Sequence, residues 1–269
     1  MAIKDITLGQ YYPGESFVHR LDPRTKILAT LVYLVSLFLV QSFTGFAFAA
    51  VCFILAVKVS KTPFSFILKG LKPILFIIIF TAFINLFMTP GEILWQWRFL
   101  KLTTEGIYRA FFMAIRLILL ILGSSLLTLT TKPISLTDGL ERMMAPLAKI
   151  GLPAHELAMM MTIALRFIPT LLEETDKIMK AQAARGADFE SGNLMQRAKS
   201  LIPILVPLFV SAFRIAGDLA MAMEARCYRG GSGRTRMNAM KYSRADAVAL
   251  LVLALYLALV IVSRSLPLF

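Results

Sequence analysis

Long apolar windows alternate with short polar connections along the chain. The windows that carry no charge, or only two charged side chains, are residues 27–57, 73–91, 107–131 and 247–263. A transmembrane helix needs about 20 mostly apolar residues, so the first window is too long for one helix. Polar and small residues at 41–45 supply a turn near its middle. We therefore predict five spans, over about residues 25–41, 44–58, 73–91, 107–131 and 247–263.

Residues 132–243 follow a different, amphipathic pattern that predicts helices outside the main spans. Ser135 or Thr137 can cap a short helix that runs to about residue 150. A second helix is predicted over about residues 154–184, with a bend at Pro169, and a third over about residues 194–227. Both long helices are apolar in their first half and charged or small in their second half.

Arg166 and Arg214 interrupt the apolar halves of these two long helices. We therefore expect both helices to lie against the membrane interior or interface rather than to cross it as simple spans. Arg166 could equally be a surface or interface residue. If the two helices instead crossed the membrane as a hairpin, the chain would have seven spans.

The patterns together predict an all-α polytopic membrane protein with about five transmembrane helices and long cytoplasmic helices. Three regions follow from this topology. Residues 1–131 form an N-terminal membrane region with four spans, residues 132–243 form the cytoplasmic helical region, and residues 244–269 form the last transmembrane helix.

Composition supports a membrane protein. Apolar residues make up 58 % of the 269 positions and charged residues 17 %, whereas soluble domains average about 45–50 % and about 25 %. This excess excludes an ordinary soluble enzyme and a disordered chain. The two cysteines are too few for a disulfide framework or a zinc site, so we expect no metal.

The net charge of +13 is concentrated on one side of the predicted spans. Lys and Arg are in excess before the first span, between the second and third spans, and in residues 132–243. By the positive-inside rule these segments, including the N-terminus, are cytoplasmic. A basic surface can also bind nucleic acid, but the chain carries no recognisable binding motif for it, so we expect no nucleic-acid partner.

The fourth predicted span carries two arginines, Arg109 and Arg116, on one helix face. In one interpretation Arg109 extends to the outer interface while Arg116 pairs inside the helix bundle. In the other, the two side chains contact a partner or a water-filled cavity.

The two long helices end in similar triplets, which are Ala184, Arg185 and Gly186 in one and Ala225, Arg226 and Cys227 in the other. A cation near a helix C-terminus complements the helix dipole, so both arginines could be helix caps. Small residues beside an arginine also let another protein approach closely, and the guanidinium can then bind a carboxylate in bidentate fashion. Two such tips lying side by side could bind two similar partners.

Asp22 and Pro23 are typical of a helix start, because Asp is a good N-cap and Pro is favoured in the first helical turn. We therefore interpret Asp22, Pro23 and Arg24 as residues with a structural role rather than a binding role.

The sequence resembles the transmembrane coupling subunits of energy-coupling factor transporters, the EcfT/CbiQ family, over essentially its whole length. The resemblance rests on HRLDPRTK at residues 19–26, LRFIP at 165–169, ARG at 184–186 and EARCYRG at 224–230. Cys227 stands where the family often has glycine. The resemblance implies cytoplasmic coupling helices whose Arg185 and Arg226 each dock in a groove of one of two ATP-binding cassette subunits.

The resemblance also implies a membrane-embedded substrate-binding subunit, held by the apolar halves of the coupling helices. ATP-driven closure of the ATPases would move these helices and tilt that subunit, for uptake of a vitamin or micronutrient across the cell membrane of a prokaryote. Further candidate structural or interface positions are Asp22, Pro23, Arg24, Arg166, Pro169 and Arg229.

The chain has no Gly-Lys dipeptide and hence no phosphate-binding loop of the Walker type. We therefore expect a non-catalytic subunit without a cofactor of its own, with ATP and Mg bound by the partner ATPases. Two other classes of function remain as alternatives. A self-contained secondary transporter predicts internal repeats and ionisable residues at the membrane midplane, and a membrane scaffold predicts no energetic link to an ATPase.

Overall fold

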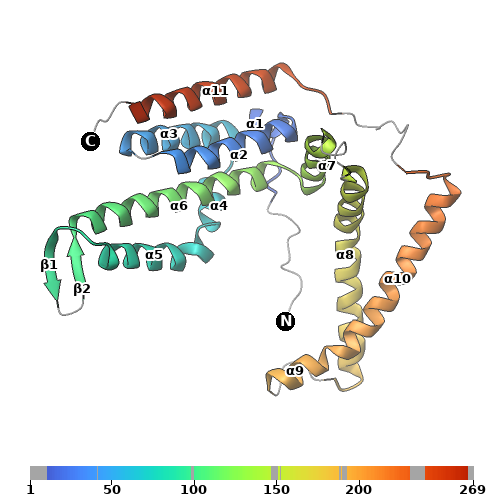
Figure 1. Ribbon diagram of the computed structural model, residues 1–269. Coiled ribbons are helices and arrows are strands. Elements are labelled where there is room, and N and C mark those ends of the chain that lie inside the picture. The colour runs from blue at the N-terminus through green and yellow to red at the C-terminus, as the bar shows by residue number, and fades with distance from the viewer. Residues whose placement is uncertain are drawn as a thin grey trace. The chain divides into compact units, whose positions relative to one another are not determined.

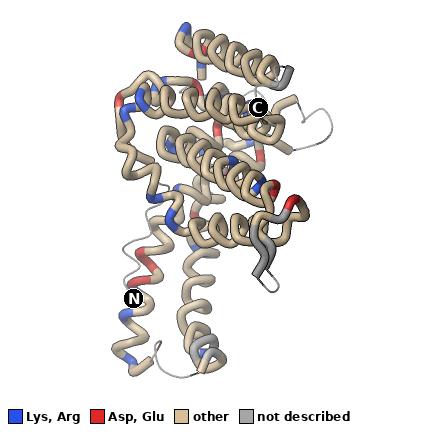
Figure 2. Tube along the Cα trace, turned by 90° about the vertical axis from the view of Figure 1, so that its left-hand side faces the viewer, with Lys and Arg blue, Asp and Glu red and all other residues tan. Residues whose placement is uncertain are grey.

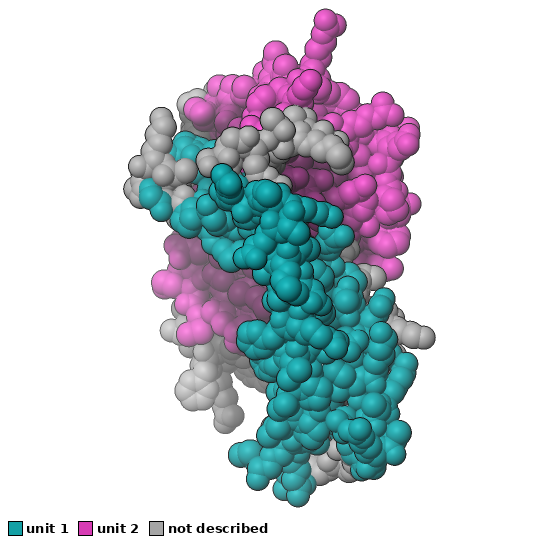
Figure 3. Space-filling model, turned by 90° about the vertical axis from the view of Figure 1, so that its right-hand side faces the viewer, with its two compact units in different colours: residues 1–8, 143–238 teal, residues 9–142, 239–269 magenta. Residues whose placement is uncertain are grey.

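The computed structural model describes residues 11–40, 42–97, 100–146, 151, 153–187, 189, 193–230 and 240–265. The chain divides into two compact units (Figure 3). Unit 1 comprises Met1–Leu8 and Met143–Asn238, and unit 2 comprises Gly9–Arg142 and Ala239–Phe269. This division follows compactness, whereas the three predicted regions follow membrane topology, so those regions stay a prediction.

Unit 2 contains the predicted membrane helices (Figure 1). Its elements in chain order are α1 (Phe17–Arg20), α2 (Pro23–Leu39), α3 (Phe43–Ser60), α4 (Phe64–Lys69), the short 3-10 helix η2 (Lys72–Ile74), α5 (Leu75–Met88), β1 (Ile93–Trp97), β2 (Leu100–Thr103), α6 (Thr104–Thr130), α7 (Pro133–Met144) and α11 (Arg244–Ser265). Each of the five predicted spans corresponds to one main helix, namely α2, α3, α5, α6 and α11.

Two features of unit 2 depart from the predicted pattern. The connection after α5 forms an antiparallel hairpin of β1 and β2, with Trp97 opposite Leu100. The short helix predicted after residue 131 begins at Pro133, so neither Ser135 nor Thr137 is its cap. Pro133 lies in the first turn, where its missing N–H costs nothing. The Thr137 hydroxyl instead donates to the Pro133 carbonyl at 3.0 Å.

The core of unit 2 lies where α2, α3, α6 and α11 meet. Leu37 and Ala49 are fully buried there, and Tyr33, Phe53 and Tyr256 are nearly so. α6 approaches α2 closely at one glycine, because a Cβ added at Gly123 would lie 2.7 Å from the Tyr33 ring. The backbones can therefore pack at a distance that a larger residue at position 123 would prevent.

Unit 1 contains α8 (Ala154–Ala184), α9 (Leu194–Ser200) and α10 (Ile202–Ala225). The predicted second helix has the expected bounds and continues through Pro169. The predicted third helix is wrong as a single element, because it divides at Leu201 into α9 and α10. Pro203 explains the break, since proline lacks an N–H for a continuous helix but fits the first turn of a new one.

Among the residues that the structure describes, six helical segments are long and apolar enough to cross a membrane by length and composition, which supports a polytopic membrane protein. They are Phe43–Ser60, Phe64–Met88, Thr104–Thr130, Ala154–Ala184, Ile202–Ala225 and Arg244–Ser263. α2 has 17 residues and is slightly shorter than these. α8 has the lowest mean hydropathy of the six, but both it and α10 are candidate spans, so the choice between five and seven spans stays a prediction.

Candidate functional site: two arginine tips and a polar clamp

The two long helices of unit 1 run antiparallel. Near the end of α8, the Gln182 side chain donates a hydrogen bond to the Pro203 carbonyl in the first turn of α10, at 3.3 Å. Just beyond the end of α10, the Tyr228 hydroxyl donates to the Met159 sulfur in the second turn of α8, at 3.0 Å. Each helix end is therefore tied to the start of the other helix.

Both helix ends close with the same pair of backbone hydrogen bonds. At the first, Gly186 N–H donates to the Ala183 carbonyl at 2.9 Å and Ala187 N–H to the Gln182 carbonyl at 3.0 Å. This pattern is the Schellman motif, in which the residue after the C-cap is left-handed. Arg185 is the C-cap and Gly186 has φ of 88°.

The second tip repeats this geometry with a different residue in the left-handed position. Cys227 N–H donates to the Glu224 carbonyl at 2.8 Å, and Tyr228 N–H donates to the Met223 carbonyl at 3.0 Å. Arg226 is the C-cap, and Cys227 has φ of 54°. The cap therefore forms without glycine, at the conformational cost of placing a Cβ in the left-handed region.

The arginine tips are exposed and carry free donors. Arg185 and Arg226 are both exposed, as are Ala184 and Ala225 beside them. Among the residues that the structure describes, neither arginine forms an ion pair. Lys180 instead binds Asp176, at 2.7 Å, in the last turns of α8. The capping role is carried by backbone bonds, so the two guanidinium groups stay available to a partner.

The two tips do not lie side by side in unit 1. Because α8 and α10 are antiparallel, Arg226 lies near the start of α8 and Arg185 at its end. Met159 and Gln182, which mark these two positions, are separated by about 35 Å of helix at about 1.5 Å per residue. The two tips therefore lie at opposite ends of the helix pair.

The other candidate residues of unit 1 lie around these tips. Arg166 and Pro169 are exposed on α8, between the two ends. Arg229 is exposed three positions beyond Arg226, and both line a cavity of about 370 Å³ between the end of α10 and the start of α8. The second tip thus presents two cations beside a partly apolar hollow.

In unit 2, the predicted helix start at Asp22 is confirmed. The Asp22 side chain accepts from Arg24 N–H at 2.9 Å, and Pro23 is the first helical residue. The Arg24 guanidinium also binds the Asp22 carboxylate through two hydrogen bonds, of 3.0 and 2.8 Å. This pair holds the pKa of the Asp22 carboxyl below its ordinary value, mainly through the side-chain hydrogen bond from Arg24.

The same site joins the start of α2 to the start of α11, which the sequence did not reveal. Asp22 N–H donates to the Asp246 carboxylate at 2.8 Å, and Ser243 donates to it through both N–H and hydroxyl. The Arg24 guanidinium lies 4.0 Å from the centre of the Tyr242 ring. We name Asp22, Arg24, Tyr242, Ser243 and Asp246 the polar clamp. The Ser243-x-x-Asp246 spacing resembles a capping box. It could have predicted the contact between Ser243 and Asp246, but not their contact with Asp22.

His19 lies in a second set of polar contacts before α2. Its ring nitrogens lie 2.6 Å from the Ser16 hydroxyl and 3.1 Å from the Tyr12 carbonyl. Partial burial lowers the pKa of His19 below its usual 6.5, and the Lys26 cation acts in the same direction, whereas the bond to Tyr12 opposes them. The neutral imidazole is therefore favoured in the folded chain.

The two arginines of α6 lie in different surroundings, and the place of Arg109 at the outer interface stays a prediction. Arg109 is exposed, whereas Arg116 is partly buried and donates to the Val40 carbonyl at 3.0 Å. Val40 is the C-cap of α2, so the guanidinium also complements the dipole at that helix end. Of the described side chains, no group of three or more His, Cys, Asp and Glu could hold a metal ion.

Basic positions mark one end of the unit 2 helices (Figure 2). The start of α2, the end of α3, the short helix α4 and the start of α11 all carry Lys or Arg. Long helices with an apolar surface and a basic end are typical of a polytopic membrane protein rather than a soluble one.

Comparison with known proteins identifies the family. Residues 14–237 match the family model CbiQ, described as cobalt transport protein. The chain is 61 % identical over 264 residues to the energy-coupling factor transporter transmembrane protein EcfT of Clostridium kluyveri, covering 97 % of this chain and 98 % of the relative. It is 50 % identical to the EcfT of Bacillus subtilis over 251 residues, covering 92 % of this chain and 95 % of that one. The chain belongs to the EcfT/CbiQ family of transporter membrane proteins.

Proposed function

We propose that this chain transmits ATP-driven motion from two ATPase subunits to a membrane-embedded substrate-binding subunit, within an energy-coupling factor importer. The observation that carries the proposal is the pair of matched caps that expose Arg185 and Arg226 at opposite ends of α8 and α10. Membership of a family whose relatives are named energy-coupling factor transporter transmembrane proteins supports it.

The spacing of the tips suits two ATPase subunits that lie next to each other. Each guanidinium can bind a carboxylate in a groove through two parallel hydrogen bonds. Because α8 is a continuous helix between the two ends, a displacement at one tip is carried along a stiff element to the other. Closure of two ATPases would therefore move the helix pair as a unit.

The apolar halves of α8 and α10 supply a surface for the substrate-binding subunit. Met160 and Met161 of α8 are 55 % and 44 % exposed, and Phe209 and Phe213 of α10 are 61 % and 76 % exposed. Methionine side chains are flexible and polarizable, which suits a surface that repacks as its partner tilts.

The remaining assignments follow from the same proposal. The basic end of unit 2 faces the cytoplasm by the positive-inside rule, and with it the N-terminus. ATP and Mg are bound by the partner ATPases, since the sequence has no phosphate-binding loop, and this chain is not itself catalytic. The cargo is a vitamin or another micronutrient.

Charge reversal of the two tips tests the proposal. The full chain is co-purified with its two ATPase subunits as wild type, as Arg185→Glu, as Arg226→Glu and as the double variant, and ATP-dependent uptake is measured in vesicles. Each single variant should weaken the hold on one ATPase subunit, and the double variant should lose both subunits and uptake. Reversing a charge that binds a buried carboxylate replaces attraction by repulsion.

Arg214→Glu is the matched control, because it makes the same charge change at an exposed position near the middle of α10, away from both tips. It should retain both ATPases. If the double variant still holds both subunits and supports uptake, the docking assignment is wrong. Uptake by the chain without any ATPase would favour a secondary transporter, and stable binding without uptake in the wild type would favour a scaffold.

A further inference from the structure

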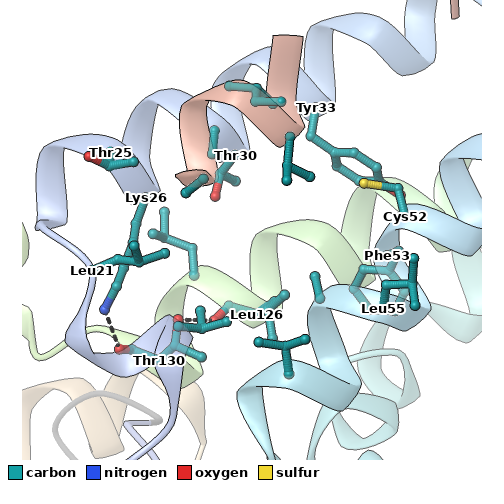
Figure 4. Close-up of a pocket in the computed structure, with 18 of the residues that line it drawn as sticks. Leu21, Thr25, Lys26, Thr30, Tyr33, Cys52, Phe53, Leu55, Leu126 and Thr130 are labelled. Carbon is teal, nitrogen blue, oxygen red and sulfur yellow. Dashed lines mark hydrogen bonds between the residues drawn. The ribbon is translucent and has the colours of Figure 1, made fainter. Parts of the chain in front are cut away.

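A mostly apolar cavity of about 320 Å³ lies inside unit 2, between α2, α3, α6 and α11 (Figure 4). Tyr33 of α2, Cys52 and Phe53 of α3 and Leu126 of α6 line its inner part. The polar groups around it are few, and the one charged residue among the described lining residues, Lys26, has its ammonium hydrogen-bonded to the His19 and Thr130 carbonyls at 3.1 and 3.0 Å. The interior therefore suits a hydrocarbon group and offers little to a polar solute.

The mouth of the cavity is rimmed by apolar side chains that face outward. Leu55 and Val59 of α3 are 56 % and 47 % exposed, and Val248 and Val252 of α11 are 54 % and 51 % exposed. On a polytopic membrane protein such side chains contact lipid tails. The cavity is therefore continuous with the hydrocarbon region of the bilayer, and a lipid tail can enter it sideways.

The volume is too large to stay unfilled beside fluid lipid. A cavity of about 150 Å³ in a soluble protein is sufficient to bind benzene, and this one has about twice that volume. The walls of an empty cavity lose their dispersion contacts, and a flexible chain that enters restores them. A segment of one acyl chain has the width and flexibility that this space needs.

Positive charge lies near the cavity. Lys58 is exposed on α3, one helical turn after Leu55 and next to Val59, which both line the cavity, so its side chain starts beside the rim without lining it. Within the described part of the chain its ammonium forms no ion pair with a carboxylate. The stem of Lys58 can follow the apolar surface while its ammonium reaches the headgroup layer.

We propose that this cavity binds one acyl chain of an anionic phospholipid from the leaflet at the basic end of unit 2, with its phosphate held by Lys58. The chain enters between α3 and α11 and fills the space against Tyr33 and Phe53. The bound lipid would then be a structural part of the bundle at the end where α2 and α11 are joined by the polar clamp.

Photo-crosslinking tests the proposal on the full chain in lipid nanodiscs, alone and in complex with its partner subunits. Phosphatidylglycerol with a diazirine on its acyl chain should label the peptides that contain residues 52–59 and 248–256 in preference to other lipid-facing helices. The same probe with a phosphatidylcholine headgroup should label them about fivefold less, because one lysine near a membrane surface favours an anionic lipid by about that factor.

Two pairs of variants separate the cavity from ordinary lipid contact. Ala56→Phe places a ring in the cavity and should abolish the preferential labelling, whereas Ala47→Phe, at an exposed position of the same helix outside the cavity, should not change it. Lys58→Gln should remove the preference for phosphatidylglycerol, whereas Lys72→Gln should leave it. Labelling spread evenly over all lipid-facing helices, or unaffected by Ala56→Phe, would overturn the proposal.

A second measurement does not depend on the Ala56→Phe variant, whose added ring could prevent folding. Cys52 lines the cavity, and Cys227→Ser leaves it as the one cysteine of the chain. Alkylation of Cys52 by an apolar thiol reagent should slow as phosphatidylglycerol is added to the detergent-solubilised protein. An unchanged rate would overturn the proposal, and so would crosslinking of the cavity peptides to another subunit in place of lipid.

Discussion

Gly186 and Cys227 occupy the same position in two equivalent helix caps, and both have a left-handed backbone, with φ of 88° and 54°. A Cβ added at Gly186 would meet no atom within 4 Å. The difference between the two caps is therefore one of backbone conformation and not of space, which makes it possible to predict the effect of exchanging the residues.

We expect Cys227→Gly to stabilise the chain and Gly186→Ala to destabilise it, each by about 1 kcal/mol, because a left-handed non-glycine residue costs about that much. Gly217→Ala is the control for Gly186→Ala, and it should raise stability instead of lowering it. Gly217 lies inside α10 with open space around it, and alanine is the better helix former. Thermal unfolding in detergent measures all three changes. A loss of stability in Cys227→Gly would contradict the prediction.

The separation of the two tips predicts a long spin-label distance. Labels on Ala184→Cys and Ala225→Cys should lie about 35 Å apart, because the antiparallel helices place them at opposite ends. Pulsed electron paramagnetic resonance measures this distance in the full chain. A value below about 20 Å would contradict the antiparallel arrangement of α8 and α10.

The labelled protein needs a background without its native thiols, supplied by Cys52→Ser and Cys227→Ser. Labels on Met159→Cys and Tyr228→Cys serve as the control. The native side chains of these two residues are joined by a hydrogen bond of 3.0 Å, so their labels, on a separate double variant, should give a short distance.

The polar clamp should contribute measurably to stability. Asp22→Asn keeps the N-cap acceptor but loses the charge-assisted bidentate pair with Arg24, and we expect it to cost about 1.5–3 kcal/mol. Glu15→Gln is the matched control, because the Glu15–Arg20 pair is exposed, with side chains 92 % and 74 % accessible, and such pairs contribute little. Equal unfolding temperatures for Asp22→Asn and the wild type would contradict the role of the clamp.

Stability should fall as the pH falls from about 7.5 to 5. The folded-state pKa of His19 is below its usual 6.5, so the unfolded chain takes up a proton first and unfolding is favoured. The contribution of His19 to stability is fully present above the unfolded-state pKa of about 6.5, and it is lost as the pH falls through the lower folded-state pKa. Unfolding temperature against pH should become flatter in His19→Gln than in the wild type, and His155→Gln shows whether the other histidine contributes.

Arg116 should matter more than Arg109, although both lie on one face of α6. Arg116→Gln removes the bond to the Val40 carbonyl at the end of α2, and we expect a loss of about 1.5–3 kcal/mol. Arg109→Gln, at an exposed position, should change stability by less than about 0.5 kcal/mol. A larger effect at Arg109 would favour a partner or cavity role for it. Thermal unfolding of the two variants gives the comparison.

Local sequence patterns predicted the helices well. Uncharged windows gave the membrane helices because the bilayer requires about 20 apolar residues in a row, and the bounds Ala154–Ala184 of α8 were correct because both of its ends carry strong local signals. The hairpin of β1 and β2 and the division at Leu201 were missed. The hairpin depends on how the short connection between α5 and α6 folds back on itself. The division at Leu201 was missed because Pro203 is also compatible with one continuous, bent helix.

The sequence by itself determined the class of protein, the positions of the main helices and the two arginine triplets. Each of these depends on hydropathy or on neighbouring residues, which local physics controls. Only the tertiary structure decided that Arg185 and Arg226 lie at opposite ends of a helix pair, that the Asp22 N–H donates to the Asp246 carboxylate, and that a cavity lies beside Lys58. Such relations depend on which helix faces pack together, and packing is set by contacts between residues far apart in the chain.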